Sequence, residues 1–394
     1  MRICILTHRY PPALGGSEKV CYNLAHEFKK KGHKVTVVTT TSMNHLDTRG
    51  FSTGRGFTLK STNHDSYAEK HDWIPVYRFK PDFQFWPFAL NKNMADFFKK
   101  NKTRFDIVHV HGYQAYEAVL VSKLDIPYVL TAHDVIAHYG GILGLIKKIF
   151  DVFFGKKILK KAKALIALTP ENKSQYLDID NRCENKVRTI PNGIEKPKKL
   201  SDEKRKDLLA FLGNPEKIIL YTGRIVEYKG CQYVIRALPE IIRQYPMTKF
   251  VVVGPDQGYA AELKDLAREL GVYENCIFTG VVDSVSGYYN IADAFVLASR
   301  GEGFGLSAVE AMSLGVPCVL ADMGGLKYVL KDIGGHPINM QEDIVSQIKK
   351  YVLSIFSDAE VKGKMKYIVE KTKDYRWDRI AEKHLDIFEK ILRN

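Results

Sequence analysis

The sequence predicts an α/β protein with two domains, each built on a doubly wound parallel sheet. Short β-branched runs alternate with helical patterns along almost the whole 394-residue chain, as in parallel strands covered by helices. The alternation stops at a lysine- and proline-containing stretch near residues 194–206, expected to be a hinge, and then restarts. The length also corresponds to about two domains of ~100–200 residues.

The expected strands follow one another in both halves. In the first half, a helix with Val20, Leu24 and Phe28 on one face follows the first strand, and this spacing is typical of a buried helical stripe. The strands expected in the first half are 3–7, 35–40, 106–111, 128–131, 165–169 and 187–190. Those expected in the second half are 218–222, 250–253, 277–279, 294–297 and 318–320.

The composition excludes several classes of protein. With 45% hydrophobic and 26% charged residues, the chain is globular rather than disordered or fibrous. No apolar run approaches the ~18 residues of a membrane-spanning helix. The first residues, MRICILTH, enter a β-like run without a basic leader, so we expect a cytoplasmic protein.

Six cysteines are spread along the chain and form no CxxC pair. Because most of them lie in apolar segments, buried thiols are expected rather than a disulfide framework or a zinc site. The cysteines are Cys4, Cys21, Cys183, Cys231, Cys276 and Cys318.

The net charge of +14 is unevenly distributed. Residues 1–195 hold 30 basic and 18 acidic side chains, or +12, whereas the remaining 29 basic and 27 acidic side chains leave +2. Such an asymmetry indicates an anionic partner for the first half, either a membrane surface or nucleic acid. A solvated basic surface is the alternative.

Polar residues and glycines follow most of the expected strands. In open parallel sheets, ligands bind beyond the carboxyl ends of the strands, so seven such segments in one chain indicate a ligand site. The segments are HRYPPALGGSE (8–18), HG (111–112), TAHD (131–134), PNG (191–193), GRIVEYKG (223–230), GPD (254–256) and SRGEGFG (299–305).

The loop SRGEGFG opens a helix expected to begin at about Leu306. Its glycines let the backbone approach a ligand, and the free amides of the helix start attract an anion. Glu302 in the loop and Glu310 in the helix would repel a phosphate, unless each accepts hydrogen bonds from neutral hydroxyls such as those of a sugar. The alternative is a helix cap with a surface acid.

The segment GRIVEYKG places Arg224 at a strand end and Lys229 at the start of the next expected helix. Both cations can converge on one diphosphate, arginine as a planar fork and lysine as a point charge. We find no Asp-x-Asp motif to hold a metal, and none is expected. The alternative is two cations that merely face solvent.

Two segments of the first half are also candidates. Gly15 and Gly16 precede Ser17 and Glu18, which are expected to cap and open a helix. His133, followed by Asp134, ends another strand. Taken alone, the glycine-containing segment is a tight turn about as often as it is a binding site. A single histidine is more often structural than catalytic.

Taken together, GGSE, TAHD, PNGI, GRxxxxKG and EGFGxxxxE resemble the retaining glycosyltransferases of family four, which use nucleotide-sugar donors. The resemblance runs over about residues 1–330. It implies the GT-B fold, two Rossmann-like domains facing a central cleft. Residues 1–195 would bind the acceptor and 196–374 the nucleotide sugar, while a terminal helix at 375–394 would cross back to the first domain.

The resemblance also assigns roles. Arg224 and Lys229 would bind the diphosphate, Glu310 the ribose and Glu302 the donor sugar, with His133 near the reacting carbon. His133, Arg224, Lys229 and Glu302 would thus be the catalytic set, without a metal or other cofactor. The full donor-binding set it implies is Gly15, Gly16, Asn192, Gly223, Arg224, Lys229, Gly254, Glu302, Gly303, Phe304, Gly305, Leu306 and Glu310.

The sequence departs from the family at one place. Where relatives often read GGxxE after the last strand, this chain has Gly324, Gly325, Leu326 and Lys327. A base therefore replaces an acid, which puts that one contact in doubt.

Two segments of the first half point to the acceptor. Residues 79–90, FKPDFQFWPFAL, are too aromatic and proline-rich for a plain strand, and residues 142–165 combine apolar side chains with lysines and a break expected at Gly155. The hypothesis is that both segments rest on an anionic bilayer and receive a lipid-linked or saccharide acceptor. Ordinary core packing with a solvated lysine face is the rival.

Three other functions stay open on the sequence. A nucleotide-sugar epimerase would share the two-domain fold, and a catalytically silent sugar-binding relative would share the motifs. A basic nucleic-acid-binding protein is suggested by charge alone, but no recognised reading module is present and the second half is nearly neutral. No nucleic-acid partner is therefore expected.

Overall fold

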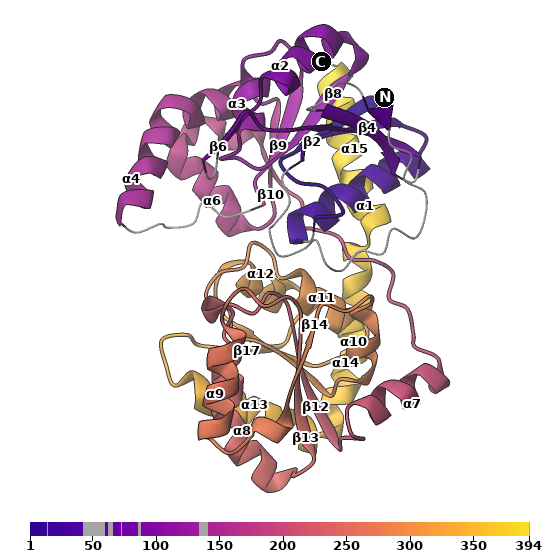
Figure 1. Cartoon of the computed structure of the whole chain (residues 1–394), viewed down its shortest axis with the longest axis vertical. Coiled ribbons are helices and arrows are strands. Elements are labelled where there is room, and N and C mark those ends of the chain that lie inside the picture. The colour runs from indigo at the N-terminus through magenta and orange to yellow at the C-terminus, as the bar shows by residue number, and fades with distance from the viewer. Residues whose placement is uncertain are drawn as a thin grey trace. The chain divides into compact units, whose positions relative to one another are not determined.

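The computed structural model describes residues 1–13, 15–41, 60–61, 66–71, 73–85, 88–133 and 141–393. Its internal contacts divide the chain into two compact units. Unit 1 comprises Met1–Gly193 together with Trp377–Asn394, and unit 2 comprises Ile194–Arg376. Each unit has its own sheet with helices around it (Figure 1).

Unit 1 contains a nine-stranded sheet, in which the strands from β11 to β5 are parallel and β4 and β3 are antiparallel additions at one edge. Every strand expected in this half is present within two residues of its predicted ends. In spatial order the strands are β11 (Val187–Thr189), β10 (Ala164–Ala167), β9 (Tyr128–Thr131), β8 (Ile107–His111), β1 (Arg2–Thr7), β2 (Lys34–Thr40), β5 (Ile74–Phe79), β4 (Ser66–His71) and β3 (Lys60–Ser61).

Strands β3, β4 and β5, which follow β2 in the order of the sheet, were not expected from the sequence. β4 reads SYAEKH and has no β-branched residue, so its propensity signal is weak, whereas β5 reads IPVYRF and carries a strand signal that sequence reasoning missed. The segment 79–90 also contains a small hairpin, β6 (Phe83–Phe85) with β7 (Phe88–Leu90). The prediction that this segment is no plain strand is therefore confirmed, because two strands of 3 residues each take its place; Trp86 and Pro87 lie outside the described residues.

The helices of unit 1 include one that is distant in sequence. Helix α15 packs against α1, where the Phe28 and Phe388 rings are 5.6 Å apart and Lys31 forms a 2.5 Å ion pair with Glu382. The residues after unit 2 thus complete the core of unit 1. The helices are α1 (Gly16–Lys30), α2 (Lys92–Asn101), α3 (Tyr116–Ser122), α4 (Gly141–Phe150), α5 (Lys156–Lys161), α6 (Pro170–Ile179) and α15 (Trp377–Arg393).

The sequence predicts that Gly155 breaks the segment 142–165. This prediction is wrong. A π-helical turn, Asp151–Gly155, joins α4 to α5 without interruption, and such a turn inserts an extra residue that rotates the following side chains. Gly155 keeps helical backbone angles. A Cβ there would lie 2.0 Å from the Tyr113 hydroxyl, so this glycine permits close packing rather than a break.

The rotation changes which side of the segment is buried. Ile158 and Leu159 on α5 are fully buried, whereas Val152 and Phe153 in the π-helical turn are 63% and 71% exposed. In Figure 1, α4 lies at the outer end of unit 1, away from α1 and α15.

We expect Ile158→Val to lower the free energy of unfolding by about 0.5–1.5 kcal/mol, because it removes a methyl group from a closed core. Val152→Ala, which truncates an exposed side chain, should change it by less than about 0.5 kcal/mol. Urea denaturation followed by circular dichroism measures both. Equal effects of the two substitutions would contradict this assignment of faces.

Unit 2 contains a six-stranded, wholly parallel sheet. All five strands expected in this half are present, and the short edge strand β17 is additional. In spatial order they are β14 (Cys276–Gly280), β13 (Thr248–Val253), β12 (Lys217–Thr222), β15 (Ala294–Leu297), β16 (Cys318–Ala321) and β17 (His336–Ile338). The two parallel sheets with alternating helices confirm the predicted α/β fold.

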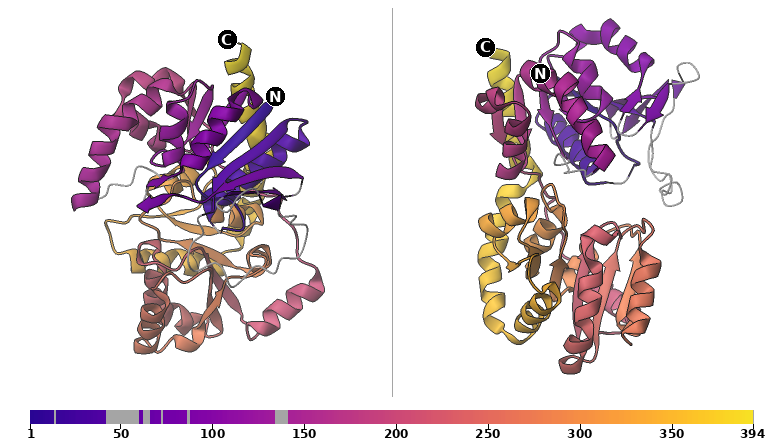
Figure 2. Two further views of the ribbon diagram at one scale, coloured as in Figure 1. Left: turned by 45° about the horizontal axis from the view of Figure 1, so that its top comes forward. Right: turned by 90° about the vertical axis from the view of Figure 1, so that its left-hand side faces the viewer.

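Helices lie around this sheet as the views of Figure 2 show. The hinge predicted at 194–206 is partly wrong, because α7 begins at Asp202 inside it. The Ser201 side chain caps that helix by accepting from the Lys204 amide, and Asp202 and Glu203 favour its positive end. The helices are α7 (Asp202–Phe211), α8 (Cys231–Gln244), α9 (Ala260–Glu269), α10 (Ser286–Ile291), α11 (Leu306–Ser313), α12 (Gly324–Asp332), α13 (Ile344–Ser357) and α14 (Ala359–Thr372).

The cysteines behave as predicted. All six are free thiols; Cys276 is partly exposed and the other five are buried. Among the described residues, no helix combines the length and apolar character needed to cross a membrane.

Candidate active site

The carboxyl ends of β12 and β13 approach each other closely in unit 2. Gly254 follows β13 with φ of 142°, and a Cβ there would lie 2.0 Å from the carbonyl oxygen of Gly223, which follows β12. Backbone bonds tie the two loops together: the Gly223 amide donates to Val253 and the Ile225 amide to Pro255, both at 2.9 Å. Only glycine at position 254 allows this approach.

Arg224 and Lys229 are both placed around Tyr228. The Arg224 guanidinium, which is exposed, donates to the Tyr228 hydroxyl at 2.7 Å and to Gln257 Oε1 at 3.3 Å. The Lys229 Nζ lies 5.3 Å from the centre of the Tyr228 ring. Lys229 ends a 3₁₀ turn and α8 begins two residues later, at Cys231, where the sequence predicted this helix to begin.

An ion pair joins this loop to the glycine-rich segment after β15. Lys229 Nζ lies 2.5 Å from Glu302 Oε1, and the two side chains are only 12% and 16% exposed. An ammonium group has three donors, so this contact holds the cation in place and leaves it the capacity for further acceptors. The two motifs singled out in the sequence therefore meet in space.

The starts of two helices converge on the glycine-rich segment. Helix α11 begins at Leu306, as predicted, directly after Gly305, while the Gly325 amide in the first turn of α12 donates to the Glu302 carbonyl at 2.8 Å. Phe304 is buried and anchors the loop against Tyr375 with ring centres 5.7 Å apart. Gly303 lies between Glu302 and Phe304 in this loop. The contribution of α12 was missed, although the glycine pair at its start was visible.

Glu310 on α11 belongs to a short hydrogen-bonded chain. Its Oε2 accepts from the Tyr289 hydroxyl at 3.1 Å, and the Tyr289 and Thr222 hydroxyls are 2.7 Å apart. Burial, and then the charge of Glu310, raises the pKa of Tyr289 well above its ordinary value, so this hydroxyl stays protonated. The chain fixes Glu310 beside the end of β12. Sequence reasoning missed Tyr289 because tyrosine in a short helix carries no motif.

Lys327, the departure from the family pattern, is exposed on α12. Its amide donates to the Met323 carbonyl in the ordinary helical manner. The charge reversal therefore falls on the surface of that helix, two residues after the Gly325 amide that holds Glu302.

In unit 1, Gly15 and Gly16 open α1 and are exposed. The prediction that Ser17 caps this helix is wrong, because the helix begins at Gly16 and Gly15 is the capping residue, with no side-chain bond. The Ser17 hydroxyl instead donates to Glu18 Oε2 at 2.8 Å. Glu18 is buried, with its Oε1 3.6 Å from Arg9 Nε.

His133 follows β9 and lies in a cluster of histidines in unit 1. Its Nε2 is 2.6 Å from Nδ1 of His111 at the end of β8. The rings of His111 and His109 are centred 4.0 Å apart, and those of His109 and His384 5.1 Å apart. Burial lowers the pKa of His133 to about 4 and that of His111 well below its ordinary value, so both rings are neutral near pH 7. Asp134 lies outside the described residues.

The predicted site residues thus fall into two groups. Those of unit 2 gather at neighbouring strand ends: Gly223, Arg224, Lys229, Gly254, Glu302, Gly303, Phe304, Gly305, Leu306 and Glu310. Gly15, Gly16, His133 and Asn192, of which Asn192 is buried, belong to unit 1.

Two family descriptions match the two halves of the chain. Residues 14–196 match "Glycosyltransferase Family 4" and residues 202–372 match "Glycosyl transferases group 1". The chain also has two Rossmann-like parallel sheets, and the motifs of unit 2 gather at the strand ends of the sheet in that unit. This chain therefore belongs to the family-four glycosyltransferases of the GT-B type.

Known proteins similar over most of the chain agree with this assignment. An uncharacterized glycosyltransferase of Methanocaldococcus jannaschii is 29% identical over 98% of both chains. The alpha-monoglucosyldiacylglycerol synthase of Streptococcus pneumoniae is 27% identical, covering 84% of this chain and 74% of that protein. Among solved structures, Anabaena HepE in complex with UDP and glucose has the same fold, with a TM-score of 0.76 at 17% identity over 98% of each chain.

Proposed function

We propose that this protein moves a sugar from a nucleoside-diphosphate sugar to an acceptor hydroxyl, with retention of configuration and without a metal ion. The observation that carries the proposal is the Lys229–Glu302 pair, which brings a fixed cation to the glycine-rich segment that opens α11. Arg224, held on Tyr228 beside it, supplies a second cation. A diphosphate bound there meets two positive side chains and the positive end of a helix.

The proposed mechanism is electrostatic. When the nucleoside diphosphate departs, negative charge grows on its phosphate and the sugar becomes oxocarbenium-like. Arg224 and Lys229 stabilise that charge from preorganised positions, which is why no metal is invoked. Glu302 and Glu310 accept hydrogen bonds from sugar and ribose hydroxyls, and neither acts as a nucleophile. A departing phosphate oxygen assists removal of the acceptor proton on the same face of the sugar.

Thermal unfolding against a panel of UDP-, GDP- and ADP-sugars tests the donor assignment. A ligand that binds only the folded state raises the midpoint temperature of unfolding, and the increase grows with the logarithm of the ligand concentration above Kd. Sugars of one nucleotide class should therefore raise the midpoint temperature, and those of the other classes should not. No change with any member at millimolar concentration would contradict the proposal. Product formation with a candidate acceptor, rather than epimerisation of the donor alone, then distinguishes transfer from the epimerase alternative.

Glu310→Gln is expected to weaken nucleotide-sugar binding about tenfold, because a hydrogen bond to a charged acceptor becomes one to a neutral amide. The glutamine keeps the length of the side chain and an oxygen for the Tyr289 hydroxyl, so the fold should be unaffected. Isothermal titration with the nucleotide identified above measures the change. The matched control is Glu342→Gln, an exposed acid on another loop of unit 2, which should bind normally.

We further propose that the acceptor is presented at an anionic membrane surface, on its cytoplasmic face, as a lipid-linked or saccharide acceptor. The α4–α5 segment supports this with five large exposed apolar side chains beside the four exposed lysines of α5. These residues are Leu145, Ile149, Val152, Phe153, Phe154, Lys156, Lys157, Lys160 and Lys161. Phe83, 60% exposed in the 79–90 segment, is a further apolar contact. Apolar side chains next to lysines are typical of surfaces that rest on anionic lipid.

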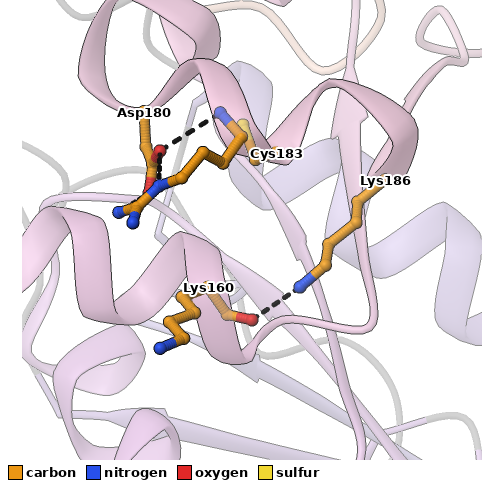
Figure 3. Close-up of a pocket in the computed structure, with 5 residues that line it drawn as sticks. Lys160, Asp180, Cys183 and Lys186 are labelled. Atoms are coloured by element: carbon orange, nitrogen blue, oxygen red, sulfur yellow. Dashed lines mark hydrogen bonds and ion pairs between the residues drawn. The ribbon is translucent and has the colours of Figure 1, made fainter.

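A basic pocket lies at the end of the same segment (Figure 3). It has a volume of about 110 Å³ and is lined by Lys160, Asp180, Arg182, Cys183 and Lys186. Arg182 forms a two-bond pair with Asp180, at 2.8 and 2.9 Å, and Lys186 Nζ donates to the Lys160 carbonyl at 2.5 Å. Three cations against one carboxylate make this pocket suited to an anionic headgroup, which supports the membrane proposal.

A further inference from the structure

The contact between His111 and His133 is a hydrogen bond between two ring edges. The ring planes are only 8° apart, and the ring centres are 4.9 Å apart while the two facing nitrogens are 2.6 Å apart. Parallel rings whose nitrogens are so much closer than their centres meet edge to edge in nearly one plane. One nitrogen must therefore carry a proton that points at the lone pair of the other.

Burial decides which of the two nitrogens carries that proton. Among the described residues, Nε2 of His111 is buried and has no hydrogen-bond partner. If His133 donated from Nε2, a neutral His111 would carry its own proton on this orphaned Nε2, and a buried N–H without an acceptor costs about 1–3 kcal/mol. The opposite arrangement leaves no orphaned N–H on His111. Its Nδ1–H then donates to His133 Nε2.

We propose that His111 is a positioning residue that holds His133 as the tautomer with its proton on Nδ1. In that state the Nε2 lone pair of His133 accepts the hydrogen bond from His111, and Nδ1 of His133 carries a proton. His133 therefore offers a neutral hydrogen-bond donor to a sugar hydroxyl and has no lone pair with which to act as a general base. This last step rests on the proposed function, in which His133 contacts the donor sugar.

A metal ion is the competing use of the same side chains. Ligand atoms of Cys21, His111 and His133 all lie within 4.8 Å of one another. In a tetrahedral site, however, the lone pairs of the ligands point at one central ion. Here the facing ring nitrogens point along a single line at each other, which fits a shared proton.

Nitrogen-15 NMR of the full chain labelled on histidine tests the tautomer without any substrate. The signals of His133 are assigned by their loss in His133→Gln. We expect one tautomer, with Nδ1 protonated and Nε2 unprotonated, in the chelator-treated protein and in the protein as purified. A His133 signal protonated on Nε2 would overturn the proposal. So would a chelator-induced change in the His111 and His133 signals, which would indicate a bound metal.

Substitutions of His111 test the positioning role. Asparagine places an amide N–H where Nδ1 was, so His111→Asn should keep the His133 tautomer and most of the activity. His111→Leu should lose the single-tautomer signature and lower kcat about tenfold, with a smaller change in KM for the donor. His26→Asn is the matched control, because Nδ1 of His26 donates to the Tyr22 carbonyl of its own helix at 2.7 Å, and this substitution should leave both readouts unchanged.

Equal effects of asparagine and leucine at position 111 would overturn the positioning role. Because the spectra are recorded without donor or acceptor, the tautomer is read independently of the reaction. If the spectra are as expected and no nucleotide sugar is bound or turned over, the proposed function fails and the tautomer assignment stands.

Discussion

Lys229→Ala is expected to lower kcat/KM for the nucleotide sugar by about 10²- to 10³-fold, as does the loss of one preorganised donor to a developing oxyanion. The cation is fixed by Glu302 and screened from water, at 12% exposure, so it acts in a medium where charge interactions are strong. Arg224→Ala should weaken nucleotide-diphosphate binding in the same direction. Its effect should be smaller, because the guanidinium is exposed and screened by solvent.

Initial rates and titration with the nucleoside diphosphate measure both effects. Lys249→Ala is the matched control, because that lysine lies in the same unit, at the amino end of β13, and donates to the Glu274 carbonyl, whereas the site lies at the carboxyl ends of the strands; it should change kcat/KM less than about twofold. Circular dichroism checks that all variants keep the fold. Unchanged affinity in both Arg224→Ala and Lys229→Ala would contradict the diphosphate assignment.

A double-substitution cycle separates the effect of losing the Lys229 cation from the effect of leaving its partner Glu302 unpaired. Lys229→Ala leaves Glu302 as a largely buried carboxylate without this partner, and part of the effect of the substitution is the cost of that unpaired charge. We expect the pair Lys229→Ala and Glu302→Ala to be less impaired in diphosphate binding than the sum of the single effects. For sugar transfer the double variant should remain strongly impaired, because Glu302 is also proposed to hold the donor sugar.

Replacing Lys156, Lys157, Lys160 and Lys161 with glutamine should reduce binding to anionic vesicles by about 10³-fold. Each lysine near such a surface contributes about 1 kcal/mol, so four contribute about 4 kcal/mol. The measurement is sedimentation with phosphatidylglycerol-containing and purely zwitterionic liposomes. The loss should appear only with the anionic liposomes and should shrink as salt is raised.

Two further variants complete this test. Replacement of Lys196, Lys199, Lys204 and Lys206, four exposed lysines of unit 2, changes the net charge equally and should leave vesicle binding intact. Phe153→Ser should weaken binding to both kinds of liposome, because it removes an exposed apolar contact. Binding that ignores both the anionic lipid content and the four-lysine replacement would rule out the membrane proposal.

Much of the fold was predictable because parallel sheets have a strong local signature. Buried strands such as β12 and β15 read as short β-branched runs, and glycines and cations at their ends marked where a ligand would bind. The helix start at Leu306 was also predictable from its glycine-rich approach. Strands β3 and β4 at the edge of the sheet were not, because their pairing depends on neighbours rather than on their own residues, and β5 was missed although its residues favour a strand.

Local sequence patterns failed to predict features that depend on packing between distant segments. The sequence of 142–165 showed two apolar faces that do not align, but only the structure shows that a π-helical turn reconciles them and that Gly155 admits the Tyr113 hydroxyl. Ser17 was expected to cap α1, yet the capping position falls on Gly15. The roles of Tyr228 and Tyr289 carry no sequence signal, because each follows from the side chains that surround it.

The amino-acid sequence by itself determined the α/β class, the order of the strands along the chain and the loops that hold Arg224, Lys229, Glu302 and Glu310, because these depend on short-range periodicity and on glycine at strand ends. The tertiary structure alone decided that Lys229 meets Glu302 across 73 positions, that Tyr289 holds Glu310 and that His111 faces His133. Contacts of this kind are set by strand order within the sheet, which no local pattern encodes.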